Sequence, residues 1–174
     1  MLRKLAGNLH HRMIANGVEA PSVDIIVYAL NIIGNSVSII ALSLIIGAVT
    51  GKFTATLLTL VVFAVIRFLT GGYHLKSGSL CIVVSTIAMS AMPHFHFGSV
   101  TIYIFTAISL IMVLIFSPAN YDKYARISEK YYPLLKLIAA LFVASNFLFV
   151  SSILAICFIV QAAMLPFKEG GESE

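Results

Sequence analysis

Long stretches without charged residues alternate with short basic segments along the chain. No Asp, Glu, Lys or Arg occurs in residues 25–51, 53–66, 77–121 or 137–167. A helix needs about 20 mostly apolar residues to cross ~30 Å of hydrocarbon. The pattern therefore predicts an all-α, polytopic membrane protein with spans over residues 25–49, 53–70, 79–93, 99–117, 134–150 and 153–167.

Each of the two longest stretches is expected to contain two spans. Pro93 and Gly98 separate the third predicted span from the fourth. The 31 residues from 137 to 167 would form ~46 Å of helix, which is too long for one span and short for two. We expect the chain to turn near Ser151 and Ser152, which gives six spans, with five as the alternative. The second span reaches full length only if Arg67 snorkels at its end.

The N-terminal 22 residues have a different pattern. Leu2, Leu5, Leu9 and Met13 recur at helical spacing, while basic and histidine side chains occupy the other faces. Such a segment is typical of an amphipathic helix that lies in the membrane interface. We expect it to anchor and orient the protein, and the alternative is a surface that also docks a peptide helix.

The composition excludes an ordinary soluble domain. Apolar residues make up 60% of the chain and charged residues 10%, whereas soluble domains have about 45–50% and about 25%. The chain has only two cysteines, too few for a disulfide framework. The length of 174 residues fits a single membrane domain, residues 1–174.

The distribution of basic residues predicts the orientation. With six spans, ten of the eleven Lys and Arg residues lie on the side of the two termini, and only Lys52 lies on the other. Lys and Arg are concentrated in cytoplasmic loops, so the N-terminus and the segment 67–81 are expected to face the cytoplasm. The net charge of +4 is thereby explained by topology, and we expect no nucleic-acid partner.

Residues 67–81 contain the chain's only close pair of histidine and cysteine, His74 and Cys81. A cysteine nucleophile needs a base, and imidazole exchanges protons near neutral pH. In an unbroken helix the two residues would be ~10.5 Å apart along the axis, beyond hydrogen-bond reach. Gly71, Gly72 and Gly78 allow the backbone to leave helical geometry and bring them together. Alanine at both Gly71 and Gly72 is expected to favour helix without loss of stability.

The third span is expected to begin near Ser77 or Ser79, because either side chain can cap a helix N-terminus. Cys81 then lies in or near the first turn, where the helix dipole and nearby cations stabilise a thiolate. Lys76 is the nearest such cation. The alternative is that Cys81 packs as a small apolar residue and that the glycines only form a tight turn.

This segment resembles the accessory gene regulator B (AgrB) family. The resemblance rests on the spacing of Arg67, Gly72, His74 and Cys81, the six-span pattern, the basic N-terminus and the run Ser117-Pro118-Ala119. It implies a membrane cysteine peptidase of bacterial quorum sensing, with Cys81 as nucleophile and His74 as its base. The implied substrate is an AgrD-like precursor peptide. Cys81 would cleave off the precursor's C-terminal tail through an acyl thioester, and an internal Cys or Ser would close a thiolactone or lactone.

Other residues of the segment are expected to bind substrate or support the site. Arg67 either snorkels or binds a substrate carboxylate. We expect no third catalytic residue, no cofactor and no metal, since His94 and His96 lack a third ligand. The supporting set is Arg67, Gly71, Gly72, Lys76 and Gly78.

The alternative function comes from another class of protein. Arg67 and His74 could line the polar path of a small membrane transporter or channel. The two interpretations differ at Cys81, which a transporter does not need and a peptidase cannot lose. We also expect a homodimer, surrounded by lipid in the bacterial cell membrane.

Overall fold

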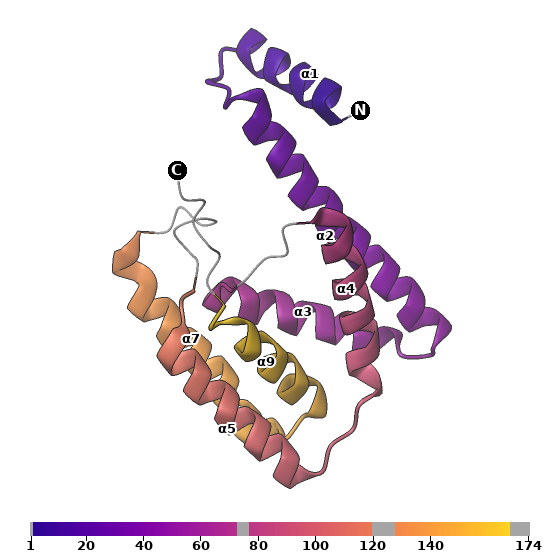
Figure 1. Cartoon of the computed structure of the whole chain (residues 1–174), viewed down its shortest axis with the longest axis vertical. Coiled ribbons are helices and arrows are strands. Elements are labelled where there is room, and N and C mark those ends of the chain that lie inside the picture. Colours follow the sequence, from indigo (N-terminus) through magenta and orange to yellow (C-terminus); the bar gives the residue numbers. More distant parts are fainter. Residues whose placement is uncertain (1, 73–76, 120–127, 168–174) are drawn as a thin grey trace.

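The structure is a computed structural model that describes residues 2–72, 77–119 and 128–167. Figure 1 shows that the described chain consists mainly of helices, and the described residues contain no β-strand. The prediction of an all-α protein is therefore confirmed. The α-helices are α1 (Leu2–Ala15), α2 (Val23–Val49), α3 (Phe53–Thr70), α4 (Gly78–Ala91), α5 (Ser99–Phe116), α7 (Tyr132–Ala144), α8 (Asn146–Phe149) and α9 (Ser152–Met164), with single 3-10 turns at η1 (Met92–His94) and η2 (Glu129–Tyr131).

Four helical segments are long and apolar enough to cross a membrane. They are Val23–Val49, Phe53–Thr70, Ser99–Phe116 and Glu129–Phe149, and two shorter apolar segments cover Gly78–His94 and Ser152–Met164. Each of the six predicted spans thus overlaps one apolar helical segment. The protein is a membrane protein by this pattern, and the number of complete crossings stays a prediction.

The turn between α8 and α9 lies where the sequence predicts a break. Val150 has a left-handed backbone with φ 49°, and the Ser151 side chain caps α9 by accepting a hydrogen bond from the Leu154 amide. Asn146 is fully buried beneath this turn. Its amide oxygen accepts from the Ser151 N–H at 2.9 Å, and its amide nitrogen donates to Thr106 Oγ1 at 3.0 Å. The buried amide therefore fixes the turn against α5.

Helix α3 packs between two groups of helices. In Figure 1, α5, α7 and α9 lie together on one side of α3, and α2 with α4 lie on the other. Val62, Ile66 and Leu69 of α3 belong to the main apolar core, together with Val113 of α5 and Phe158 of α9. The end of α3 is therefore placed by the apolar core that it shares with α5 and α9.

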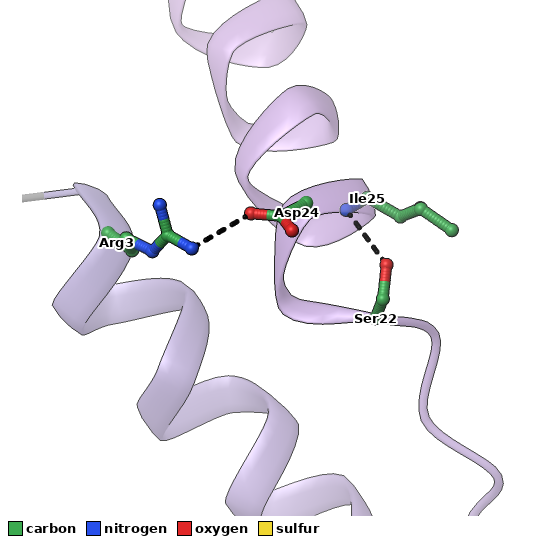
Figure 2. A network of polar contacts seen from close by, with 4 residues as sticks. All are labelled: Arg3, Ser22, Asp24 and Ile25. Carbon is green, nitrogen blue, oxygen red and sulfur yellow. Dashed lines mark hydrogen bonds and ion pairs between the residues drawn. The ribbon is translucent and has the colours of Figure 1, made fainter.

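The N-terminal helix α1 packs against the first part of α2 and buries Ala6 there. Figure 2 shows the ion pair that joins them, with Arg3 Nη2 3.3 Å from Asp24 Oδ1. Both side chains are more than three-quarters exposed, so this pair adds little stability. The apolar side chains expected to enter the membrane interface are exposed at Leu2, Leu5 and Leu9.

Candidate active site

Helix α3 ends at the predicted pair of glycines. The amide of Gly71 donates to the Arg67 carbonyl at 2.9 Å, and Gly71 and Gly72 then have φ values of 70° and 127°. Such positive φ angles are favourable for glycine and strained for residues with a Cβ. The expectation that these glycines take the chain out of helical geometry is met at both positions.

The backbone after α3 is held by the segment that follows α5. Gly72 N–H donates to the Ala119 carbonyl at 3.0 Å, and Ala119 N–H donates to the Thr70 carbonyl at 2.9 Å. These two bonds form an isolated parallel bridge between Gly71 and Ala119. The run Ser117-Pro118-Ala119 thus fixes the direction in which the chain leaves α3.

A buried glutamine on α9 joins these elements. Gln161 has no exposed surface, and its amide nitrogen donates to Thr70 Oγ1 at 2.9 Å and to the Gly71 carbonyl at 2.6 Å. Its amide oxygen lies 3.4 Å from Arg67 Nη1, which donates to it. Arg67 Nη1 also lies 3.6 Å from the sulfur of Met164. Gln161 therefore binds both the end of α3 and the arginine one turn before it.

Gly72 lies against this glutamine. A Cβ added at Gly72 would lie 3.2 Å from Gln161 Nε2 and 3.9 Å from a methyl carbon of Leu165. Gly72 itself is buried. The position needs glycine both for its backbone angle and for the close approach of Gln161.

Cys81 lies in the first turn of α4. Ser77 is the N-cap, with its hydroxyl accepting from the Leu80 amide at 3.4 Å and its carbonyl accepting from the Cys81 amide at 2.9 Å. Of the two predicted caps, Ser77 is therefore the one used. The Cys81 side chain is buried, and its sulfur lies 3.9 Å from Ser85 Oγ. The positive end of the helix dipole at this turn favours an anion.

A cavity of about 430 Å³ opens beside this thiol, between α2, α3, α4 and α9. Cys81 and Ser85 line it from α4, Arg67 from α3 and Met164 from α9. The structure thus brings the predicted nucleophile and the predicted arginine to one cavity. That volume is within the range of ligand sites, about 300–1,000 Å³.

Comparison with known proteins places the chain in a family. A family model described as Accessory gene regulator B matches residues 2–167. The chain belongs to the accessory gene regulator B family. No curated protein and no solved structure matches it. The resemblance drawn from the sequence is therefore confirmed over nearly the whole chain.

Membership assigns this AgrB-family chain to the processing of quorum-sensing peptides. The family is one of membrane cysteine peptidases, and it implies an AgrD-like precursor as the substrate. The assignment agrees with the several apolar helices of a membrane protein.

The predicted site residues of this AgrB-family protein divide into three groups. Arg67, Gly71 and Gly72 are joined through Gln161, and Cys81 lines the same cavity as Arg67. Gly78 begins α4, and a Cβ there would lie 3.0 Å from the side-chain nitrogen of Asn35. The predicted base His74 and the predicted cation Lys76 lie outside the described residues.

The second cysteine has a different environment. Cys157 lies in the core between α9 and α3, with its sulfur 3.9 Å from the Thr59 carbonyl, and it has no exposed surface. His94 and His96 lie beyond the other end of α4. Among residues 2–72, 77–119 and 128–167, no three His, Cys, Asp or Glu residues gather as metal ligands do.

Sequence reasoning missed Gln161 and Asn146. Both are amides inside an apolar stretch, where a buried polar side chain needs a hydrogen-bond partner. An amide in an apolar stretch therefore indicates a hydrogen bond to another part of the fold. The partners lie 90 and 91 residues away for the amide nitrogen of Gln161, so no local pattern identifies them.

Proposed function

We propose that this protein is a cysteine endopeptidase that cleaves and cyclises an AgrD-like precursor with Cys81 as nucleophile and His74 as base. His74 takes the thiol proton, and the Cys81 sulfur attacks the scissile carbonyl. The C–N bond then breaks, the tail amine takes the proton from His74, and an acyl thioester remains on Cys81. An internal thiol or hydroxyl of the precursor displaces Cys81 to close a thiolactone or lactone.

One observation carries this proposal. In a chain of the AgrB family, Cys81 lies in the first turn of a capped helix and lines a cavity large enough for a peptide segment. The helix dipole there stabilises the thiolate that attacks. Cys157 has neither feature, since it lies beyond the first turn of α9 and is not among the residues that line the cavity.

The surroundings of Cys81 also favour ring closure over hydrolysis. Cys81 is 8% exposed, and its cavity has mainly apolar walls. An acyl thioester kept away from bulk water persists longer. The precursor's own nucleophile, tethered to the acyl group, then has a high effective concentration.

The distribution of basic residues indicates how the protein is oriented across the membrane. With six spans, ten of the eleven Lys and Arg residues lie on the side of Arg67, which supports a cytoplasmic active site. A homodimer in the membrane remains part of this proposal.

The decisive experiment compares the two cysteines. We expect Cys81→Ala to abolish cleavage of the precursor in co-expressing cells, and Cys157→Ala to retain it, because only Cys81 lines the cavity. Mass spectrometry of the purified protein should also find an acyl adduct on Cys81. Full cleavage by a normally inserted Cys81→Ala protein would contradict the peptidase function and favour the transporter alternative.

A further inference from the structure

The geometry points to the cavity beside Cys81 as the binding site for large apolar side chains of the peptide, those on the acyl side of the scissile bond. This inference rests on the proposed function, because it takes Cys81 as the nucleophile. It adds the chemical class of the residues that must precede the cleavage point. It follows from the course, the lining and the opening of the cavity.

The cavity extends along one face of α4 from the thiol. Cys81, Val84, Ser85, Ala88 and Met89 line it, and their spacing of three and four residues places them on one side of a helix. Ala88 lies two turns beyond Cys81, ~10.5 Å along the axis. When an acyl carbon is bonded to the Cys81 sulfur, the side chains nearest to that carbon therefore lie at the start of this cavity.

The lining selects apolar groups. Arg67 is the one charged residue among the described residues that line the cavity, and it lies at the end of α3. The rest of the lining is mostly aliphatic and aromatic side chains, such as Ile39 of α2 and Leu60 and Phe63 of α3. Burying a charged or amide side chain there without a partner is costly. An apolar side chain gains free energy from the same burial.

The cavity is open along one side. Ile40 of α2, Leu57 and Val61 of α3 and Val84 of α4 line it and are 43–53% exposed. All four lie within apolar membrane helices, so this opening faces hydrocarbon. An apolar peptide segment can enter from the bilayer while its carbonyl reaches the thiol at the end of α4. A lipid chain could fill the same space, but the Cys81 thiol and the Arg67 guanidinium that line it would have no function toward a lipid.

The test uses thiol reagents as probes of the cavity, in full-length protein that carries Cys157→Ala in lipid nanodiscs. Benzyl and methyl methanethiosulfonate are compared by following the mass of the intact protein. Burial of the benzyl ring should make the benzyl-to-methyl rate ratio about ten-fold higher at Cys81 than at a lipid-exposed thiol, Ile87→Cys in a Cys81→Ala protein. Ala88→Phe, which fills the cavity, should lower the ratio at Cys81 about ten-fold from its parent value.

A matched control separates cavity filling from a general effect of a new aromatic ring. Ile87 is adjacent to Ala88 but is 63% exposed and does not line the cavity, so Ile87→Phe should keep the parent ratio. Ala64→Phe narrows the cavity from α3 and serves if Ala88→Phe does not fold. The partitioning of each reagent into lipid is the same for all variants. A change in the benzyl-to-methyl ratio between variants therefore reports a change in the cavity.

Two outcomes overturn the inference. One is a benzyl-to-methyl ratio at Cys81 no higher than at the exposed thiol of Ile87→Cys, which is the result expected if lipid fills the cavity. The other is an equal ratio in the parent, Ala88→Phe and Ala64→Phe proteins. Neither measurement requires cleavage, so failure of the peptidase function is recognised separately, by retained processing in the Cys81→Ala protein.

Discussion

Gln161 makes the hydrogen bonds that connect three parts of the site. It binds the Thr70 hydroxyl, the Gly71 carbonyl and the Arg67 guanidinium from a fully buried position on α9. A leucine of similar size would leave the Gly71 carbonyl without this donor. The residue therefore fixes the end of α3, where the segment toward α4 begins.

We expect Gln161→Leu to lower the free energy of unfolding by about 1–3 kcal/mol and to reduce precursor cleavage more than this loss explains. Asn146→Leu provides the matched control, because Asn146 is an equally buried amide that fixes the turn at Ser151 instead. Thermal unfolding in detergent and cleavage assays on both variants check this. Equal activity losses at equal stability would assign Gln161 a purely structural role.

The sequence predicts a residue's role well where the cause is local. Ser77 caps α4 and places Cys81 in the first turn because capping involves residues three positions apart. The contact between Gln161 and Gly71 spans 90 positions, and only tertiary packing determines it. The approach of His74 to Cys81 stays a prediction, since His74 lies outside the described residues.

At the scale of elements, apolar periodicity and helix breakers locate most helices. The predicted span 53–70 has the bounds of α3, and the predicted break near Ser151 lies at the start of α9. The order in which helices pack is not readable in this way. The apolar faces of different helices have similar sequences, so the sequence does not show which faces pack together. The position of α9 against α3 and α5 comes from the structure.

The two glycines after α3 give a prediction that differs from the one based on helix propensity alone. Alanine at Gly71 and Gly72 was expected to favour helix and to leave stability intact, but both residues have positive φ and Gly72 meets Gln161. We expect Gly72→Ala to destabilise the protein by about 1–3 kcal/mol and to reduce cleavage.

The control for this variant is Gly98→Ala. Gly98 has a φ of −67°, and no atom lies within 4 Å of a Cβ built there, so its stability and cleavage should equal those of the parent. Chemical unfolding followed by circular dichroism, with cleavage measured in parallel, tests the pair. Unchanged stability of Gly72→Ala would show that the chain after α3 adapts to a side chain.

At the scale of the whole molecule, the direction in which α4 crosses the membrane determines the side on which Cys81 lies. Ser77 caps its first turn, and Gly98 precedes α5 after the η1 turn. The apolar segment Gly78–His94 has 17 residues, which reach ~25 Å as a helix and approach the ~30 Å of a bilayer core. If this segment crosses, Ser77 and Gly98 lie on opposite sides, and the concentration of Lys and Arg in cytoplasmic loops predicts that Ser77 faces the cytoplasm.

The orientation is tested by cysteine labelling in a protein without native cysteines, made by Cys81→Ala and Cys157→Ala. Ser77→Cys and Gly98→Cys each add one thiol at an exposed position. A membrane-impermeant maleimide added to intact cells should label Gly98→Cys and leave Ser77→Cys unmodified, because only the former faces outward. In inverted vesicles the labelling should reverse. Labelling of Ser77→Cys in intact cells would place the thiol of Cys81 on the outer face, where a cytoplasmic precursor could reach it only after crossing the membrane.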